Sequence, residues 1–312
     1  MVPRPEDRSP PSWPLERTQS LCTLSTTVRS RSNGRAFAPA WSPDGRQLAY
    51  GGDYDGNAWV DDRSYPLGDI ASLEWTPDGR FLLYERGGIR LLDTATGTEE
   101  LLSPGTWPAL SPDGHTVAYL RYKRKKGTTD PIASTLQVVE LAGGEARVLA
   151  RTTGPPFGPH FESRPQWFAD GSAVAVARRI TQEGTWAVER VGLDGTREDI
   201  VPEIGEEFAL SPDGRLIAYQ LTEYRIALGV AEVGTSGNVY QLGKLVPKAS
   251  LGLRNFAGLT WSPDGQEIAF YLSSGSGEIM RVYALEATTG ETRRLAEIEQ
   301  AAYADLAWKP DR

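Results

Sequence analysis

Cysteine and histidine are nearly absent from this sequence of 312 residues. The single cysteine, Cys22, has no second cysteine with which to form an internal disulfide, and two histidines, His115 and His160, are too few for a metal site built on several histidines. Short catalytic motifs are also missing: there is no Gly-x-Ser-x-Gly elbow, no His-Glu-x-x-His pair and no glycine-rich phosphate loop. These gaps exclude several enzyme classes, and we expect no cofactor.

Long hydrophobic runs and an excess of positive charge are missing as well. No run approaches the roughly 20 apolar residues of a membrane-spanning helix, and the opening residues include acids and prolines where a signal peptide needs an apolar stretch. The net charge is −8, so the molecule as a whole repels nucleic-acid phosphates and anionic lipids. We expect a soluble protein with no nucleic-acid partner and no membrane insertion, and 27 arginines against six lysines favour a bacterial source.

A short motif, Trp/Leu-Ser-Pro-Asp-Gly, recurs along nearly the whole chain. Its copies lie at residues 41–45, 75–79, 110–114, 168–171, 210–214, 261–265 and 308–311, and the fourth lacks the proline. Successive aspartates are 34 to 57 residues apart, which is the spacing of propeller blades or another repeat array. Proline presets φ, aspartate binds nearby amides and glycine adopts a left-handed conformation, so the motif predicts a tight β-hairpin turn.

Short apolar runs follow the motif copies, for example residues 48–50, 117–119 and 268–270. They do not alternate with polar residues, so each predicted strand is covered on both faces, as in a blade between two neighbours. Further turn signals, such as residues 94–97 and 287–290, separate a third and a fourth strand. The sequence thus predicts an all-β protein, a β-propeller of four-stranded blades over residues 20–312 as a single domain, preceded by a flexible N-terminal segment, residues 1–19.

Seven motif copies favour seven blades, with six blades as the alternative. The last copy ends before a second strand, so its blade needs strands from elsewhere in the chain. Residues 20–29 can supply one or two strands, and the ring would then be closed by N- and C-terminal strands. An unclosed ring is the competing hypothesis.

The strings WSPDGRQLAY, LSPDGRLIAYQ and WSPDGQEIAFY, followed by fourth strands of the GETRRL type, resemble the WD40-like PD40 repeats of the family typified by the TolB propeller. The resemblance covers about residues 36–312. It implies a β-propeller that works as a binding module in the bacterial envelope, and hence a periplasmic or extracellular location. The repeats also look like those of prolyl-oligopeptidase-type propellers, which implies a possible role beside a peptidase on a separate chain.

Length variation between repeats falls on one side of the predicted propeller. The motif turns share one face with the turns between third and fourth strands, whereas the turns between second and third strands share the other face with the links between blades. The insertions at residues 121–135, 152–166 and 247–259 all lie on this second face, which is the candidate binding surface. We expect a non-catalytic scaffold that binds a protein or peptide partner there, as a monomer or as part of a larger complex.

The candidate contact residues are cations and aromatics within these insertions, because such residues contribute much of the binding energy at interfaces. The first insertion has four consecutive cations next to a tyrosine and can dock an acidic partner, although such runs are usually just solvated. The candidates are Tyr122, Lys123, Arg124, Lys125, Lys126, Phe157, His160, Phe161, Arg164, Arg254 and Phe256.

Two further hypotheses concern metal binding and catalysis. Asp53, Asp55 and Asn57 offer alternating oxygen ligands of the kind that calcium prefers, but they lack the full calcium-loop pattern, and an acidic hairpin loop is the simpler interpretation. The alternative function is a hydrolase or lyase acting on a peptide or carbohydrate fragment in the central channel, since propeller enzymes assemble their sites from several blades. A cluster of acids with a histidine at one mouth of the channel would favour it.

Overall fold

The computed structural model describes most of the chain in segments. These are residues 21–25, 36–52, 56–68, 70, 72–128, 131–154, 161–181, 185–205, 207–221, 227–235, 237–241, 253–274, 279–299 and 304–310. The regular elements in these segments are all β-strands, as the sequence predicts. The expected N-terminal segment, residues 1–19, lies outside the described residues.

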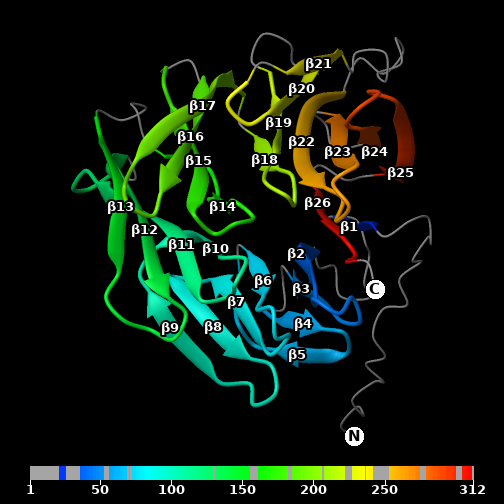
Figure 1. The fold of residues 1–312 in the computed structure, drawn as a ribbon. Helices are drawn as coiled ribbons and strands as arrows, with labels where there is room; N and C mark the ends of the chain where they lie inside the picture. The colour runs from blue at the N-terminus through cyan, green and yellow to red at the C-terminus, as the bar shows by residue number, and fades with distance from the viewer. Residues whose placement is uncertain are drawn as a thin grey trace, which may run out of the picture.

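Six sheets of four antiparallel strands make up most of the fold, and we number them as blades 1 to 6 in chain order. The blades surround a common centre, and the first strand of each blade lies innermost (Figure 1). Blades 1 to 3 contain β2 (Ala36–Trp41), β3 (Leu48–Gly52), β4 (Ala58–Val60) and β5 (Arg63–Tyr65); β6 (Leu73–Trp75), β7 (Phe81–Glu85), β8 (Ile89–Asp93) and β9 (Glu99–Ser103); β10 (Thr106–Leu110), β11 (Thr116–Arg124), β12 (Pro131–Glu140) and β13 (Arg147–Thr153). Blades 4 to 6 contain β14 (Gln166–Trp167), β15 (Ala173–Arg179), β16 (Trp186–Gly192) and β17 (Arg197–Ile204); β18 (Phe208–Leu210), β19 (Leu216–Gln220), β20 (Ala227–Glu232) and β21 (Asn238–Gln241); β22 (Leu253–Trp261), β23 (Glu267–Ser274), β24 (Ile279–Glu286) and β25 (Thr292–Glu299).

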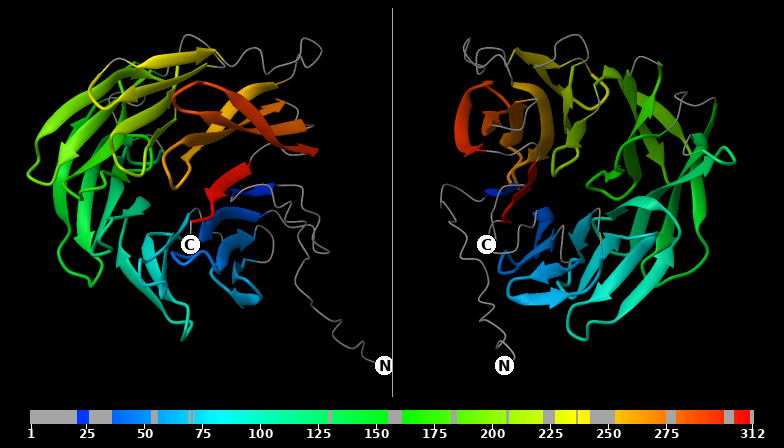
Figure 2. Two further views of the ribbon diagram at one scale, coloured as in Figure 1. Left: turned by 45° about the vertical axis from the view of Figure 1, so that its right-hand side comes forward. Right: turned by 180° about the vertical axis from the view of Figure 1, so that it is seen from behind.

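The prediction of seven four-stranded blades is wrong, because the described segments form six, the number that the sequence left as the alternative. A seventh sheet has only two strands, β1 (Leu21–Ser25) and β26 (Ala304–Trp308), which pair antiparallel. This terminal sheet lies between blade 6 and blade 1 (Figures 1 and 2). The motif marks an innermost strand, and its seventh copy supplies β26 without the three further strands of its own blade among the described residues. Closure of the ring through the two chain ends stays a prediction.

One aspartate and one serine hold the repeated turn. In blade 5, Asp213 accepts a hydrogen bond from the Ser211 hydroxyl at 2.6 Å and from the N–H of Arg215 at 3.0 Å. Equivalent bonds recur in blades 1, 2, 3 and 6, where Thr76 replaces serine in blade 2. The motif glycines have φ between +63° and +74°, the left-handed region that glycine enters freely. The serine hydroxyl, followed by the backbone amide, lowers the pKa of Asp213, so the carboxylate stays charged and keeps both bonds at neutral pH.

The fourth motif begins one residue earlier than the sequence indicated. Trp167 takes the position of Trp261 in blade 6, and Phe168 takes the position of the serine. Phe168 has no hydroxyl to donate to Asp170, which accepts a hydrogen bond from the N–H of Ser172 at 2.9 Å. The turn therefore keeps its backbone form without the serine–aspartate bond.

Hydrophobic side chains fill the spaces between neighbouring blades. One cluster, for example, joins β18, β19 and β20 of blade 5 to β22, β23 and β24 of blade 6. An alanine at the middle of the second strand allows close approach in five blades, and each of these alanines is fully buried: Ala49, Ala118, Ala175, Ala218 and Ala269. Each blade is thus covered on both faces, which explains the unbroken apolar runs in the sequence.

A tryptophan at the first motif position joins its blade to the preceding one. The indole N–H of Trp261 in blade 6 donates to the backbone carbonyl of Ala209 in blade 5 at 2.9 Å. The same bond joins Trp75 to Ala40, Trp167 to Ala109 and Trp308 to Thr260. Trp41 in blade 1 is different, because its indole N–H is buried and has no hydrogen-bond partner among the described residues. The ammonium group of Lys309 lies 5.0 Å from the centre of the Trp41 ring.

Polar side chains of two inner strands bind the following blade. Glu74 in β6 accepts a hydrogen bond from the N–H of Leu110 at 3.1 Å, and Gln166 in β14 accepts one from the N–H of Leu210 at 2.8 Å. The carbonyls of the same two peptide groups receive the indole bonds of the blades that follow. One peptide group in β10 and one in β18 are therefore held from both sides, which fixes the spacing of the blades.

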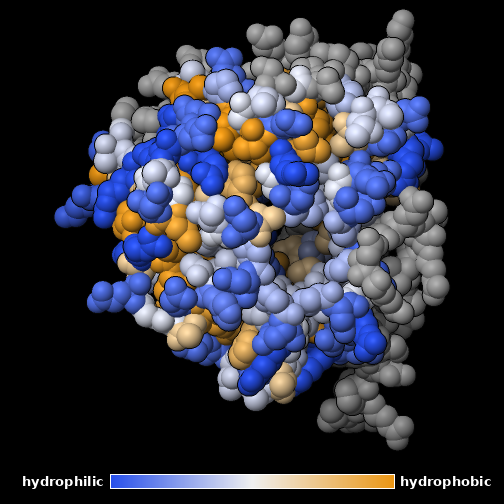
Figure 3. Space-filling model, in the orientation of Figure 1, coloured by the Kyte–Doolittle hydropathy of each residue, from blue (hydrophilic) through white to orange (hydrophobic). Residues whose placement is uncertain are grey.

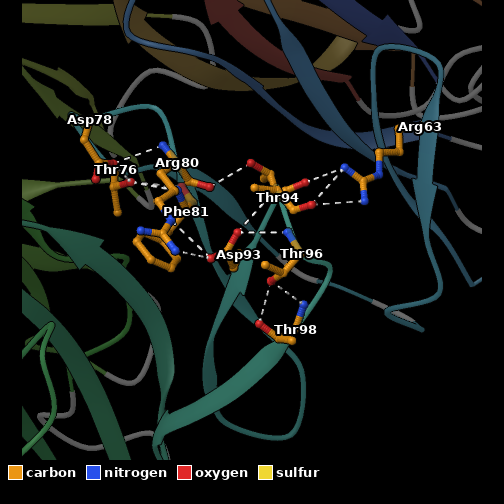
Figure 4. A network of polar contacts seen from close by, with 10 residues as sticks. Arg63, Thr76, Asp78, Arg80, Phe81, Asp93, Thr94, Thr96 and Thr98 are labelled. Atoms are coloured by element: carbon orange, nitrogen blue, oxygen red, sulfur yellow. Dashed lines mark hydrogen bonds and ion pairs between the residues drawn. The ribbon is translucent and has the colours of Figure 1, made fainter.

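The motif side carries further contacts between blades 1 and 2 (Figure 4). Arg80 donates to the carboxylate of Asp93 through Nε at 3.1 Å and Nη2 at 2.7 Å, and the other carboxylate oxygen accepts the N–H of Thr96 at 3.1 Å. From blade 1, Arg63 donates to the carbonyl of Thr94 at 2.8 Å. The polar groups at this corner of the motif side thus serve to hold adjacent blades together.

The substitution Trp261→Phe tests the bond between blades. Phenylalanine keeps an aromatic ring in the core but leaves the Ala209 carbonyl without its donor, and an unsatisfied buried group costs about 1–3 kcal/mol. We expect the free energy of unfolding, measured by urea denaturation, to fall by about that amount. Trp41→Phe is the matched control, because the Trp41 indole has no hydrogen bond to lose within the described chain. Equal losses in the two variants would show that ring volume, and not the hydrogen bond, stabilises the contact.

Candidate functional site

The first predicted insertion folds as a long hairpin in blade 3. Its strands β11 and β12 contain nine and ten residues, against five in each of β7 and β8 in blade 2. The pairing continues as far as Arg124 and Pro131. The insertion is therefore an extension of the blade and not an irregular loop, and its tip lies on the insertion side of the ring.

Five cations gather in the last part of this hairpin, which we call the cationic tip. They are Arg121, Lys123, Arg124, Lys125 and Lys126, and all five are exposed. Among the described residues, no carboxylate forms an ion pair with any of the three lysines. The whole chain has a net charge of −8, so the cationic tip is a local reversal of sign. Such a concentration of charge attracts anionic groups, and the range of this attraction becomes shorter as the salt concentration rises.

Tyr122 fixes the base of the cationic tip to the neighbouring blade. Its hydroxyl donates to the backbone carbonyl of Phe161 at 2.7 Å, and Phe161 is bridged to Arg178 in β15 of blade 4. Burial raises the pKa of the Tyr122 phenol, and the charge of Glu162 raises it further, so the hydroxyl stays protonated and keeps donating. The guanidinium of Arg124 lies 5.9 Å from the centre of the same ring, within the range of a cation–π contact.

Trp107 lies beside this tyrosine, at the insertion-side end of the inner strand β10. The two rings meet edge to face with 6.2 Å between their centroids, and Trp107 is partly exposed. The backbone of Trp107 has a φ of 54°, a left-handed conformation that is uncommon for a bulky residue. Glu85 of blade 2 holds this conformation, because its carboxylate accepts the N–H of Trp107 at 2.7 Å and the hydroxyl of Thr106 at 2.5 Å.

Other charged side chains near this corner bind within the protein. Glu162 accepts hydrogen bonds from Nε of Arg179 at 2.7 Å and from the indole N–H of Trp186 at 3.1 Å. Arg164, one of the predicted contact residues, donates to Glu74 at 2.6 Å and to a backbone carbonyl of β10 at 2.8 Å. These groups join blades 2, 3 and 4, and their charges are balanced inside the fold.

A groove of 410 Å³ lies between the outer parts of blades 3 and 4. Arg178 and Arg197 both bind the buried carboxylate of Glu189, the latter at 2.6 Å through Nη2. The lining residues are Arg151, Thr152, Thr153, Arg178, Glu189, Arg197, Glu198 and Asp199. Three arginines face three carboxylates, so the lining has no net charge, and two of the arginines are engaged by the buried glutamate. We therefore assign this groove to the packing of the blades.

The structure places the remaining candidates in different ways. Phe161 is fully buried beneath the hairpin, where its carbonyl receives Tyr122. Arg254 and Phe256 lie in β22 of blade 6, away from the hairpin of blade 3 (Figure 1). Asn57 lies just before β4 in blade 1. The candidates outside the described residues are Asp53, Asp55, Phe157 and His160.

Two residues of this corner, Trp107 and Glu85, were not among the sequence candidates. Trp107 stands three residues before the motif leucine Leu110, where blades 1 and 6 have Ala38 and Gly258. An alignment of the repeats upstream of the motif would have shown Trp107 as the aromatic residue at a position that is otherwise small, in blades 1, 2 and 6, or charged, in blades 4 and 5. Nothing in the sequence around Glu85 distinguishes it from a solvated residue at the end of a strand.

Hydrophilic side chains cover much of the face seen in Figure 3 and surround an opening near its centre.

Within the described part of the chain, no group of three or more histidine, cysteine, aspartate or glutamate side chains is arranged to hold a metal ion. A search of the same residues finds no helix with the length and apolar character needed to cross a membrane.

The sequence matches no protein-family model and no curated protein. Solved structures, however, share its arrangement of blades. The β-propeller domain of Cps50 (Swd1) from Myceliophteria thermophila aligns with a TM-score of 0.56 and 16% identity, over 89% of this chain and 90% of that chain. The fold is that of a WD40-like β-propeller.

Other solved propellers that are similar belong to different kinds of protein. Acylaminoacyl peptidase from Pyrococcus horikoshii aligns with a TM-score of 0.56 and 15% identity, over 88% of this chain and 47% of that chain, so this chain spans about half of that enzyme. A candidate TolB protein from Agrobacterium tumefaciens aligns with a TM-score of 0.49 and 15% identity, over 94% of this chain and 98% of that chain. The likeness to the Cps50 (Swd1) domain and to the peptidase concerns the fold alone at such identities, and it confirms the propeller that the repeats predict.

The substitution Tyr122→Phe tests the attachment of the cationic tip. It removes one phenol–carbonyl hydrogen bond, so we expect unfolding to become easier by about 0.5–1.5 kcal/mol and backbone amides of residues 121–128 to exchange faster. Tyr240→Phe is the matched control, since Tyr240 donates a similar bond to the carbonyl of Ala287 at 2.9 Å in blades 5 and 6. Hydrogen exchange in the hairpin should not change in that control. Unchanged exchange in Tyr122→Phe would mean that the hairpin is held by its strand pairing alone.

Proposed function

We propose that this protein is a binding module that holds an acidic protein or peptide segment on the insertion side of blades 3 and 4. The observation that carries the proposal is the cationic tip of the β11–β12 hairpin. It brings five exposed cations together on a chain whose net charge is −8.

The distribution of charge supports an acidic partner. An anionic segment is repelled by the molecule as a whole and attracted by the cationic tip, so it meets the surface in one place and one orientation. Charge complementarity of this kind raises the association rate and excludes wrong partners. The arginines of the neighbouring corner and groove contribute less, because they are already bound to carboxylates such as Glu74 and Glu189.

The rigidity of the hairpin supports recognition of a partner. Lysines on a loose loop lose conformational freedom when they bind, which weakens binding. Here the strands pair as far as Arg124, and the Tyr122 hydroxyl joins the hairpin to blade 4. Arg121, Lys123 and Arg124 are therefore presented on paired strands, and Lys125 and Lys126 follow directly in the turn.

A fluorescein-labelled peptide of about eight glutamates serves as the probe, with binding measured by fluorescence anisotropy at low salt. We expect the double substitution Lys125→Glu and Lys126→Glu to weaken binding by about tenfold or more, since it reverses two charges of the cationic tip. Raising the salt concentration to about 0.5 M should weaken binding to the unmodified protein as well.

The double substitution Arg46→Glu and Arg215→Glu is the matched control. Both arginines are exposed in motif turns on the other side of the ring, and the change in net charge is identical. We expect this control to bind the peptide nearly as well as the unmodified protein. Equal weakening in the two double variants would overturn the proposed site, and an unmodified protein that does not bind the peptide would overturn the proposed function.

A further inference from the structure

A tryptophan in a left-handed backbone conformation stands next to the cationic tip. Trp107 has a φ of 54°, and its ring meets the Tyr122 ring edge to face. Left-handed conformations are unfavourable for large side chains and concentrate at functional sites, where the surrounding structure maintains them. Here the Glu85 carboxylate maintains the conformation through the N–H of Trp107.

Equivalent positions in other blades show that this conformation does not require a tryptophan. Three residues before the motif, blade 1 has Ala38 with a φ of 48° and blade 6 has Gly258 with a φ of 76°. The pairing of first and second strands shifts its register at this place in all three blades, so each contains the same β-bulge. Small residues fit this bulge with less strain, and the large ring of Trp107 therefore needs another explanation.

Packing against the hairpin accounts for only part of the ring. Tyr122 already has its own attachment through the Phe161 carbonyl, and part of Trp107 remains exposed. The exposed surface is at the insertion-side end of the innermost strand, β10. It lies beside the Tyr122 ring, which the guanidinium of Arg124 also contacts. An apolar surface and a group of cations thus meet at one corner of the propeller.

We propose that Trp107 is the apolar contact of the partner site and receives an aromatic or large aliphatic side chain that lies within the acidic segment. This inference rests on the proposed function and specifies the partner as an acidic segment with one large apolar residue. The geometry suits an extended peptide, whose side chains on one face recur about every 7 Å. The Trp107 and Tyr122 centroids are 6.2 Å apart, and the Arg124 guanidinium is 5.9 Å from the Tyr122 ring. A tryptophan at the centre of a contact, with charged groups around it, is a common arrangement at interfaces.

Two peptides test the inference: the peptide of about eight glutamates, and the same peptide with one central glutamate replaced by phenylalanine. We expect the unmodified protein to bind the phenylalanine peptide about fivefold more tightly, because burial of an aromatic ring outweighs the loss of one charge. Trp107→Ala should remove this preference while it still binds the all-glutamate peptide. Alanine is tolerated at this position in blade 1, as Ala38, and Trp107→Phe should retain most of the preference.

The variants of the cationic tip separate the two proposals. Lys125→Glu with Lys126→Glu should weaken both peptides equally and leave their ratio unchanged. If neither peptide binds the unmodified protein, the proposed function fails. If both bind with the same affinity, or if the preference persists in Trp107→Ala, the function stands and the role of Trp107 is overturned. Urea denaturation of each variant checks that the ring remains folded.

Discussion

The hydrogen bond from a motif indole to the carbonyl of the preceding blade is the contact on which the arrangement of blades depends. It recurs at four places with the same donor and the same acceptor position, and at β10 and β18 a polar side chain of the preceding blade binds the N–H of the same peptide group. The neighbouring blades pack closely enough to bury the alanines of the second strands completely. Trp41, beside the terminal sheet, keeps its place in the pattern without this hydrogen bond among the described residues.

Contacts at the inner strands and on the motif side leave the opposite ends of the blades free to differ in length. The β11–β12 hairpin uses this freedom, because it lengthens two strands without disturbing the motif turn or the indole bond. The bond from Tyr122 to blade 4 then turns the extension into a fixed part of the surface. A cationic tip built in this way has a defined position relative to Trp107, which is what a site for an extended acidic segment requires.

Much of the fold could be predicted from local sequence, because proline, aspartate and glycine act within a few residues of one another. The number of blades could not be predicted, since the motif marks an innermost strand and not a whole blade. Among the described residues, the sheet of the seventh copy consists of β26 and its partner β1. The candidate site was predicted in part. Lys125 and Lys126 are recognisable as a run of charge. The left-handed conformation of Trp107 belongs to a β-bulge that recurs in blades 1 and 6, and the sequence does not show that a carboxylate of another blade binds the N–H of Trp107. The sequence around Phe161 is compatible with a surface contact and with a core residue. In the structure its side chain is buried.

The central claim about the site is that an acidic segment binds the insertion side of blades 3 and 4 and not the motif side. Hydrogen exchange of the backbone amides, measured with and without the phenylalanine-containing glutamate peptide, tests this claim most directly. We expect the peptide to slow exchange at residues 106–107 and 121–128 and to leave exchange at the motif turns unchanged. Slower exchange at the motif turns, or no change at the hairpin while the peptide is bound, would contradict it.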